Sequence, residues 1–203
     1  MYTPQHYKQT DLEEIKGFLL ENSFGILVHQ VEGKPWATHI PLELDSDAYG
    51  QDFLVGHISK ANPQAQNLTD ANQVLCIFNG PHSYISSSWY HKEEVPTWNY
   101  IAVHIYGKLR VLAEEEVMAS LHKLVDKYEQ NSKNPISLKD MSAHTLRQVK
   151  GIVGFQISID DIQATYKLSQ TRPEDHSKII QELEATNTAN ALQIAKAIKK
   201  TTK

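Results

Sequence analysis

The chain has 203 residues, of which 40% are hydrophobic and 22% charged, a composition that is typical of a globular protein and excludes a disordered one. Its 20 Lys and Arg against 24 Asp and Glu give a net charge of −4, which excludes the general basic character of nucleic-acid and membrane-surface binders. We therefore expect any contact with DNA to be local or indirect. The first residues lack the regions of a signal peptide, and no apolar run is long enough to cross a membrane, so we expect a cytoplasmic protein.

The first part of the chain predicts one short helix followed by strands. Thr10-Asp11-Leu12-Glu13 offers a capping box for a helix that ends near residue 22. The hydrophobic period then changes to two, with strands predicted over residues 24–30, 36–44, 52–58 and 74–78. The only cysteine, Cys76, lies in the last of these strands. It cannot form an intrachain disulfide, and we expect it to be buried rather than reactive.

The second part of the chain adds one long strand and most of the helices. Residues 80–97 are rich in Ser and aromatic side chains and are expected to be irregular. The other predicted elements are a strand over 98–112, helices from 114 and from 137 to just before 151, strands over 152–159 and 164–168, and a helix from 173 to the C-terminus. Strands in the middle and helices at the rim predict a mainly β (α+β) fold, an antiparallel sheet or barrel with peripheral helices. We expect a single domain over 1–203, with a C-terminal helical extension from about residue 173.

The longest predicted strand, residues 98–112, carries an unusual outer face. Its odd positions, from Asn99 to Val111, form a row with a period of two that is expected to face the core. The even positions are more aromatic than a solvated strand face: Trp98, Tyr100, Ala102, His104, Tyr106, Lys108 and Arg110. Such a face predicts a cover, and a subunit interface, helices of the same chain and a flat ligand are all open alternatives.

Residues 57–64 predict the end of a strand, a polar turn and the start of a helix. Asn62 suits the N-cap and Pro63 the first helical position of a helix that runs to about residue 70. The Ser59 hydroxyl, the Lys60 ammonium and free backbone N–H groups would then converge on one spot, which suits a phosphate. A capped helix with a solvated lysine is the alternative, because the segment lacks the glycines of a nucleotide-binding loop.

Residues 36–42 predict a strand with two different faces. The residues of one face are Trp36, Thr38, Ile40 and Leu42, and those of the other are Ala37, His39 and Pro41. Pro41 cannot donate a ladder hydrogen bond, so it marks an edge, a bulge or a break at which backbone groups are free for a ligand. An ordinary edge strand is the alternative.

Motifs for metal binding and for nucleophilic catalysis are absent from the sequence. The ten histidines include no pair at i, i+4 and no Cys/His cluster, so no metal site is predicted. Ser86-Ser87-Ser88 lacks the glycines of a nucleophile elbow, and no glycine-rich dinucleotide fingerprint occurs.

A series of short blocks extends over nearly the whole chain. The blocks are Met1-Tyr2-Thr3-Pro4 with His6, residues 38–42, 56–63, 78–86, 88–90 and 95–100, Val103-His104 with Gly107, and residues 167–170 with Arg172. In this order they resemble the PaiB-type family of FMN-binding negative transcriptional regulators, within the FMN-binding split β-barrel superfamily. The resemblance implies a dimeric split β-barrel, a homodimer with FMN at the subunit interface. FMN and the second subunit would then cover the aromatic strand face.

The resemblance also implies the residues that contact FMN. The residues expected along the edge of the isoalloxazine ring and at the phosphate turn are Thr38, His39, Ile40, Pro41, Leu42, His57, Ser59, Lys60 and Asn62. Those expected from the second subunit are Thr97 and Trp98, and those expected near the flavin pocket are Lys167, Ser169, Gln170 and Arg172.

Three residues depart from the family pattern. Ser88 stands where Pro is expected and Thr171 where Asn is usual, so the outer pocket is expected to differ. Lys60 replaces a common Arg, which keeps the charge but loses the bidentate geometry toward phosphate.

The function implied is flavin redox chemistry on a small molecule that the sequence does not identify. Flavin supplies the hydride chemistry, which agrees with the lack of an acid–base pair in the sequence. One alternative is a DNA-binding negative transcriptional regulator without catalytic activity. The other is a haem-binding split barrel with His39, His57 or His104 as the axial ligand.

Overall fold

The computed structural model describes residues 1–201, and its eight strands form one sheet. They are β1 (Lys8–Gln9), β2 (Phe24–Val31), β3 (Lys34–Ser46), β4 (Asp52–Ser59), β5 (Gln73–Ile85), β6 (Thr97–Val111), β7 (Ile152–Ser158) and β8 (Asp161–Lys167). The strand order is β1-β8-β6-β5-β2-β3-β4-β7, and β6 also pairs with β7. This additional pairing joins the two ends of the run from β6 to β7, so six of the strands close into a barrel.

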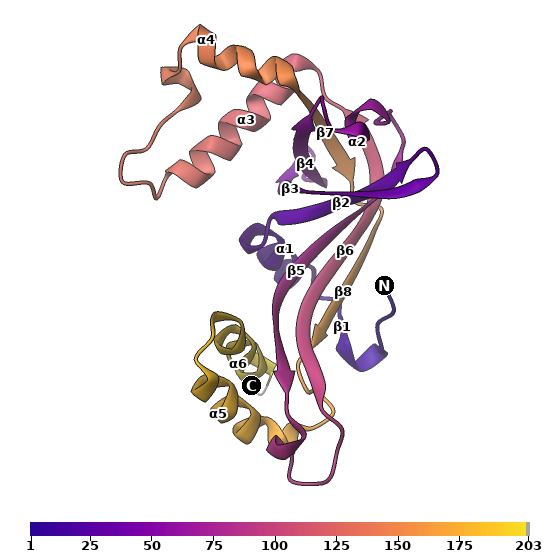
Figure 1. The fold of residues 1–203 in the computed structure, drawn as a ribbon, viewed down its shortest axis with the longest axis vertical. Coiled ribbons are helices and arrows are strands. Elements are labelled where there is room, and N and C mark those ends of the chain that lie inside the picture. Colours follow the sequence, from indigo (N-terminus) through magenta and orange to yellow (C-terminus); the bar gives the residue numbers. More distant parts are fainter. Residues whose placement is uncertain (202–203) are drawn as a thin grey trace. The chain divides into compact units, whose positions relative to one another are not determined.

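Six α-helices and five short 3-10 helices complete the described residues (Figure 1). The α-helices are α1 (Leu12–Glu21), α2 (Pro63–Gln66), α3 (Glu114–Glu129), α4 (Ala143–Leu146), α5 (His176–Thr186) and α6 (Ala189–Thr201). The 3-10 helices are η1 (Gln5–Tyr7), η2 (Ser87–Trp89), η3 (Leu138–Asp140), η4 (Arg147–Gly151) and η5 (Pro173–Asp175). Within residues 1–201, no helix is both long enough and apolar enough to cross a membrane.

The chain divides into two compact units. Unit 1 comprises residues 1–18, 78–104 and 163–203, and unit 2 comprises residues 19–77 and 105–162. In unit 1, α5 and α6 lie side by side as a helical pair (Figure 1). In unit 2, α3 contacts β4 and β7.

Strand β6 confirms the predicted period of two as far as Leu109, but the prediction is wrong for Val111, which was expected to face the core and is exposed. Its odd residues from Asn99 to Leu109 are all buried, whereas Trp98, Lys108 and Arg110 on the even row are exposed. The even-row residues with rings between them are half-buried. The aromatic face is therefore only partly covered by residues 1–201 of a single chain.

Strand β3 changes its partner at Pro41, which confirms the predicted break. Residues 34–41 pair with β2, up to the Pro41–Phe24 pair. The pairing with β4 then starts at Leu42, opposite Gly56. A residue that cannot donate to a ladder fits the point at which one ladder ends and the other begins.

Strand β5 extends well beyond its predicted end. It was expected to stop at Phe78, but it continues to Ile85 through Asn79-Gly80-Pro81, and only the segment after it is irregular. A Cβ at Gly80 would lie 2.5 Å from the ring of Phe18, so glycine here permits a close approach of the helix to the strand. The expectation that residues 80–97 are irregular is thus wrong for residues 80–85.

Most predicted helices form, but several boundaries are wrong. The first helix is capped by Asp11, whose carboxylate accepts from the N–H groups of Glu13 and Glu14, rather than by Thr10. Helix α2 ends at Gln66, and the helix expected from residue 137 is divided into η3, α4 and η4. The C-terminal helix is interrupted at Asn187, which has a left-handed φ of 52° and ends α5.

Helix α3 organises a small apolar cluster in unit 2. The sequence predicts one apolar stripe of Val117, Leu121, Leu124 and Tyr128 on this helix. Val117 and Leu121 are buried with Leu138 of η3. Leu124 is partly buried, whereas Tyr128 at the end of the stripe is exposed. The short helices between α3 and β7 therefore pack on α3.

Candidate functional site

The polar turn after β4 is closed by its own hydrogen bonds. The N–H of Ala61 donates to Ser59 Oγ at 3.2 Å, and the N–H of Gln64 donates to Asn62 Oδ1 at 2.9 Å. The N–H of Lys60 donates to the carbonyl of the residue before β7, at 2.8 Å. The prediction that Asn62 caps α2 is confirmed, but the prediction of free backbone N–H groups is wrong, because the turn itself uses them.

A buried network behind this turn centres on Gln64. The hydroxyl of Thr38 donates to Gln64 Oε1 at 2.5 Å and accepts from Asn62 Nδ2 at 2.9 Å. Gln64 Nε2 lies 2.9 Å from His29 Nδ1 and also donates to the carbonyl of Leu27 at 3.3 Å. An amide nitrogen can only donate, so His29 Nδ1 is the acceptor, and burial lowers the pKa of His29. Thr38 and Asn62, both predicted to contact the cofactor, thus fix the turn to β2 and β3.

The cations near this turn line a groove. Lys60 and Lys150 both line it, and neither has a carboxylate partner within 4.0 Å among residues 1–201. Glu114 is the single acidic residue that lines it. The groove has a volume of about 450 Å³, and its apolar wall consists of Val111, Leu112, Val117, Val149, Ile152, Val153 and Gly154. An anion with an apolar body matches this lining. Sequence reasoning missed Lys150, which lies 90 residues from Lys60 along the chain.

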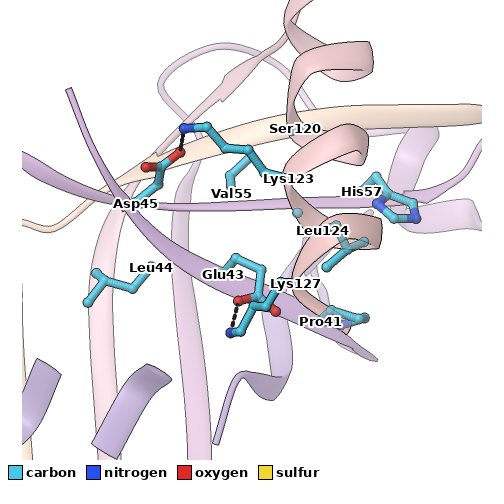
Figure 2. A pocket seen from close by; sticks show the side chains of 11 residues that line it. Pro41, Glu43, Leu44, Asp45, Val55, His57, Ser120, Lys123, Leu124 and Lys127 are labelled. Carbon is cyan, nitrogen blue, oxygen red and sulfur yellow. Dashed lines mark hydrogen bonds and ion pairs between the residues drawn. The ribbon is translucent and has the colours of Figure 1, made fainter. Parts of the chain in front are cut away.

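A second, smaller pocket of about 120 Å³ lies between β3, β4 and α3 (Figure 2). Pro41 and His57 line it, and burial lowers the pKa of His57. Two ion pairs, drawn in Figure 2, place a lysine of α3 on each acidic residue of the pocket: Lys123 with Asp45 and Lys127 with Glu43. These pairs leave no unpaired carboxylate in the pocket.

The other residues of β3 that were predicted to contact the cofactor, Ile40, Leu42 and His39, differ in the burial of their side chains. Ile40 and Leu42 are buried core residues, so their side chains face away from any ligand and only their backbone is available. His39 is exposed on the opposite face of the strand. This alternation is the one that the sequence predicts.

In unit 1, Lys167 and Thr97 lie together. Lys167 Nζ donates a hydrogen bond to Thr97 Oγ1 and lies 5.6 Å from the centroid of the Tyr7 ring. Burial lowers the pKa of Lys167. Thr97, expected from the second subunit, and Lys167, expected near the flavin pocket, are therefore neighbours within one chain.

Ser169 and Gln170 form part of the turn after β8. Ser169 has a left-handed φ of 60°, and its hydroxyl accepts from Asn99 Nδ2 at 2.9 Å. Gln170 Oε1 accepts from the N–H of Leu168 at 2.8 Å, and its Nε2 donates to the carbonyl of Tyr166. Both side chains therefore form hydrogen bonds that stabilise the turn.

Arg172 is engaged on the same turn. Its guanidinium forms an ion pair with Glu94 and lies 4.9 Å from the ring centroid of Tyr90. Burial raises the pKa of the Tyr90 hydroxyl, and the positive charge of Arg172 opposes that shift.

Trp98 belongs to an exposed aromatic group at the end of β6. Its side chain is 53% exposed, and the rings of His82 and Tyr84 lie 5.9 Å and 6.0 Å from it. This group, defined here as the Trp98 cluster, is an exposed aromatic surface whose rings are tilted against one another, and it suits contact with an aromatic ligand or with a second chain.

A histidine–aspartate pair lies beside the turn after β8. Asp175 is buried, and it accepts hydrogen bonds from the backbone N–H and the Nδ1 of His91. The two residues are 84 positions apart, so no spacing in the sequence marks them as partners.

Two surfaces of the structure match parts of FMN: the groove matches its phosphate, and the Trp98 cluster matches its ring. The groove offers Lys60 and Lys150 to a phosphate, since two ammonium groups that have no acidic partner in the described part of the chain suit a phosphate. The Trp98 cluster offers an exposed aromatic surface to the ring.

Comparison with solved structures identifies the fold class. The chain aligns with the FAD and heme binding protein from Mycobacterium smegmatis with a TM-score of 0.61 and 16% identity, covering 79% of this chain and 73% of that one. It aligns with the flavocytochrome Anf3 from Azotobacter vinelandii with a TM-score of 0.59 and 16% identity, covering 81% of this chain and 72% of that one. At this identity the likeness defines the fold alone, a split β-barrel with peripheral helices.

Sequence comparison identifies the family. Residues 1–161 match the family described as "Putative FMN-binding domain". The chain is 46% identical over 199 residues to "Protease synthase and sporulation protein PAI 2" from Bacillus subtilis, covering 96% of this chain and 95% of that protein. The chain therefore belongs to the PaiB-type family of FMN-binding proteins, which confirms the resemblance and makes FMN its cofactor. The family match ends before most of β8, α5 and α6.

Proposed function

We propose that the protein is a cytoplasmic homodimer that binds FMN and uses it for redox chemistry on a small molecule. The observation that carries this proposal is the groove in which, among residues 1–201, neither Lys60 nor Lys150 has a carboxylate partner. Membership of an FMN-binding family supports the same cofactor.

In this proposal the two lysines and the Ser59 hydroxyl hold the phosphate, and the backbone of residues 38–42 borders the ring. Thr97 and Trp98 of the partner subunit cover the ring, and their exposed neighbours exclude water from it. Lys167, Ser169, Gln170 and Arg172 shape the wall of the pocket. Bound FMN supplies hydride chemistry, so the chain need only bind, orient and shield it.

The first experiment is a spectrum of the purified protein before any cofactor is added. We expect the absorbance of oxidised flavin, which a reduced nicotinamide then bleaches. A colourless protein that takes up no added FMN would remove the proposal. A flavin that binds but that no reduced nicotinamide or dithionite reduces would remove its redox part.

The phosphate site is tested by comparing FMN with riboflavin, which lacks the phosphate. We expect Lys60→Ala and Lys150→Ala each to weaken FMN binding about tenfold, a typical loss for one charge-assisted contact, and to leave riboflavin binding unchanged. Lys133→Ala is the matched control, because Lys133 is an exposed lysine of unit 2 outside the groove. Equal weakening of FMN and riboflavin would contradict the assigned phosphate contact.

The homodimer is tested by light scattering on the FMN-loaded protein. We expect the mass of two chains, and Trp98→Ala is expected to weaken the dimer because it removes the largest exposed ring of the Trp98 cluster. A single chain in solution would remove the dimer from the proposal.

A regulatory role is proposed only as an indirect one, through turnover of a small molecule. The basic last turn of α6 offers little to DNA, because Lys199 is held by Glu184 at 2.6 Å. Salt-dependent gel-shift binding of the purified protein to specific DNA would overturn this preference in favour of a DNA-binding regulator.

A further inference from the structure

The pocket between β3, β4 and α3 in unit 2 has the size of a single ring. Its volume is about 120 Å³, whereas a cavity of about 150 Å³ in another protein binds benzene. The three fused rings of a flavin are therefore too large for it. The pocket shares no lining residue with the groove of Lys60 and Lys150, to which the phosphate is assigned.

Aliphatic side chains form part of the lining. Leu44 of β3, Val55 of β4 and Leu124 of α3 line the pocket together with the ring of Pro41 (Figure 2). Because the removal of apolar surface from water is favourable, these side chains favour a ligand with an apolar body.

The lysines and carboxylates that line the pocket already neutralise one another. Lys123 is paired with Asp45, and Lys127 is paired with Glu43 (Figure 2). The hydroxyl of Tyr128 also donates to Glu43, at 2.8 Å. A charged ligand would lose its hydration here without gaining an unpaired counter-charge, so the pocket favours a neutral one.

Two polar groups of the lining remain open to a ligand. Among residues 1–201, no hydrogen bond or ion pair holds the half-buried ring of His57. Burial lowers its pKa from a usual value of about 6.5, so the ring is mostly neutral at pH 7, with one donor and one acceptor nitrogen. The Ser120 hydroxyl donates to the carbonyl of Val117 at 2.8 Å, which leaves its oxygen able to accept.

We propose that this pocket binds a small neutral molecule with a single ring and a hydroxyl group, of which phenol is the simplest. The ring contacts the aliphatic lining, and the hydroxyl donates to the acceptor nitrogen of His57. This inference goes beyond the proposed function, which uses only the backbone of Pro41 from this lining. The resemblance assigns His57 to FMN, so competition with FMN is part of the test.

The first experiment compares phenol with toluene, which has the same ring but no hydroxyl. NMR of nitrogen-15-labelled protein follows the amide signals of the lining residues during each titration. We expect His57→Leu to weaken phenol binding about tenfold, the upper value for one hydrogen bond, and to leave toluene binding nearly unchanged. His144→Leu is the matched control, because His144 is an exposed histidine of unit 2 outside the pocket. An unchanged ratio of the two affinities in His57→Leu would overturn the inference.

The second experiment fills the pocket from α3. Ser120→Leu adds apolar volume to the lining, so we expect it to abolish the binding of phenol and of toluene. Ser120→Ala adds no volume and should bind both probes within about twofold of the wild type. Leucine and alanine both suit a helix, so the fold is expected to persist in both variants. If Ser120→Leu binds phenol as the wild type does, the probe lies elsewhere and the inference is overturned.

Charged probes test the chemical class. We expect benzoate and benzylammonium to bind at least tenfold more weakly than phenol, because each would have to compete with an existing ion pair of the pocket. Tighter binding of either charged probe than of phenol would overturn the assignment to a neutral ligand.

Titrations with FMN separate this inference from the proposed function. We expect phenol to bind equally to the FMN-free and the FMN-loaded protein. Loss of phenol binding on loading with FMN would overturn the inference, assign His57 to the cofactor and leave the proposed function standing. A protein that binds phenol but no FMN would overturn the proposed function alone. A protein that binds FMN but no phenol at millimolar concentration would overturn the inference alone.

Discussion

Two turns of this chain were both assigned to the cofactor by resemblance, and the structure uses them differently. In unit 2, the turn over residues 59–64 buries Thr38, Asn62 and Gln64 in a network and leaves Lys60 exposed beside a groove. In unit 1, the turn after β8 pairs nearly all of its polar side chains, and Arg172 is bound to Glu94.

The difference shows that residues of a motif divide into those that hold a site and those that are free to contact a ligand. In unit 2 the motif itself contains the free group, the Lys60 ammonium. In unit 1 the free group is the imidazole of His91, which lies outside the quoted motif and is held by Asp175. Hydrogen bonding within the protein, rather than membership of a motif, decides which side chain is available.

The largest expected effect concerns the buried anchor of the turn in unit 2. Gln64→Ala removes the acceptor of the Thr38 hydroxyl, a donor to the Leu27 carbonyl and the partner of His29 Nδ1. We expect a loss of about 3 kcal/mol in the free energy of unfolding, at the upper end for unsatisfied buried groups. Urea denaturation measures it, with Gln66→Ala as the control because Gln66 is exposed on the same helix. A loss below 1 kcal/mol would contradict a structural network.

The sequence predicts the frame of unit 2 well because its signals are local. The period of β6, the N-cap Asn62 and the break at Pro41 each follow from the chemistry of a few neighbouring residues. The extension of β5 was missed because Gly80 is explained by Phe18, which lies 62 positions earlier. Lys150 and the His91–Asp175 pair were missed for the same reason, since each depends on a contact between distant segments.

The buried anchor of the turn in unit 1 is expected to contribute less. Asn99→Ala leaves the Ser169 hydroxyl without its donor, and we expect a loss of about 2 kcal/mol in the free energy of unfolding. The double variant with Ser169→Ala should cost less than the sum of the two single losses, with a coupling of about 1 kcal/mol. Strict additivity in urea unfolding would show that the pair does not interact.

Asp175 gives this turn a pH dependence of its own. The folded pKa of Asp175 is lowered, so its contribution to stability is present above the unfolded pKa of about 4 and is lost as the pH falls through the folded pKa. We expect the wild type to lose stability below about pH 4 more steeply than Asp175→Asn, which at pH 7 is about 1 kcal/mol less stable. Parallel curves from thermal unfolding at pH 3 to 7 would refute the assigned hydrogen bonds.

The smallest effect on the free energy of unfolding is expected for Lys60 and Lys150, the two lysines whose replacement is expected to weaken FMN binding. Lys60 and Lys150 are exposed and have no carboxylate partner among residues 1–201, so replacing either by Ala should change the free energy of unfolding by less than about 0.5 kcal/mol. With FMN at about 100 times the wild-type Kd, the same variants should lose about half of the rise in Tm that the ligand gives the wild type, because tenfold weaker binding lowers the stabilisation from about 2.7 to about 1.4 kcal/mol. Gln64→Ala should behave in the opposite way, with a low Tm in the absence of FMN. If Lys60→Ala instead lowered the Tm of the ligand-free protein as much as Gln64→Ala does, the division between holding and contacting residues would not apply to this turn.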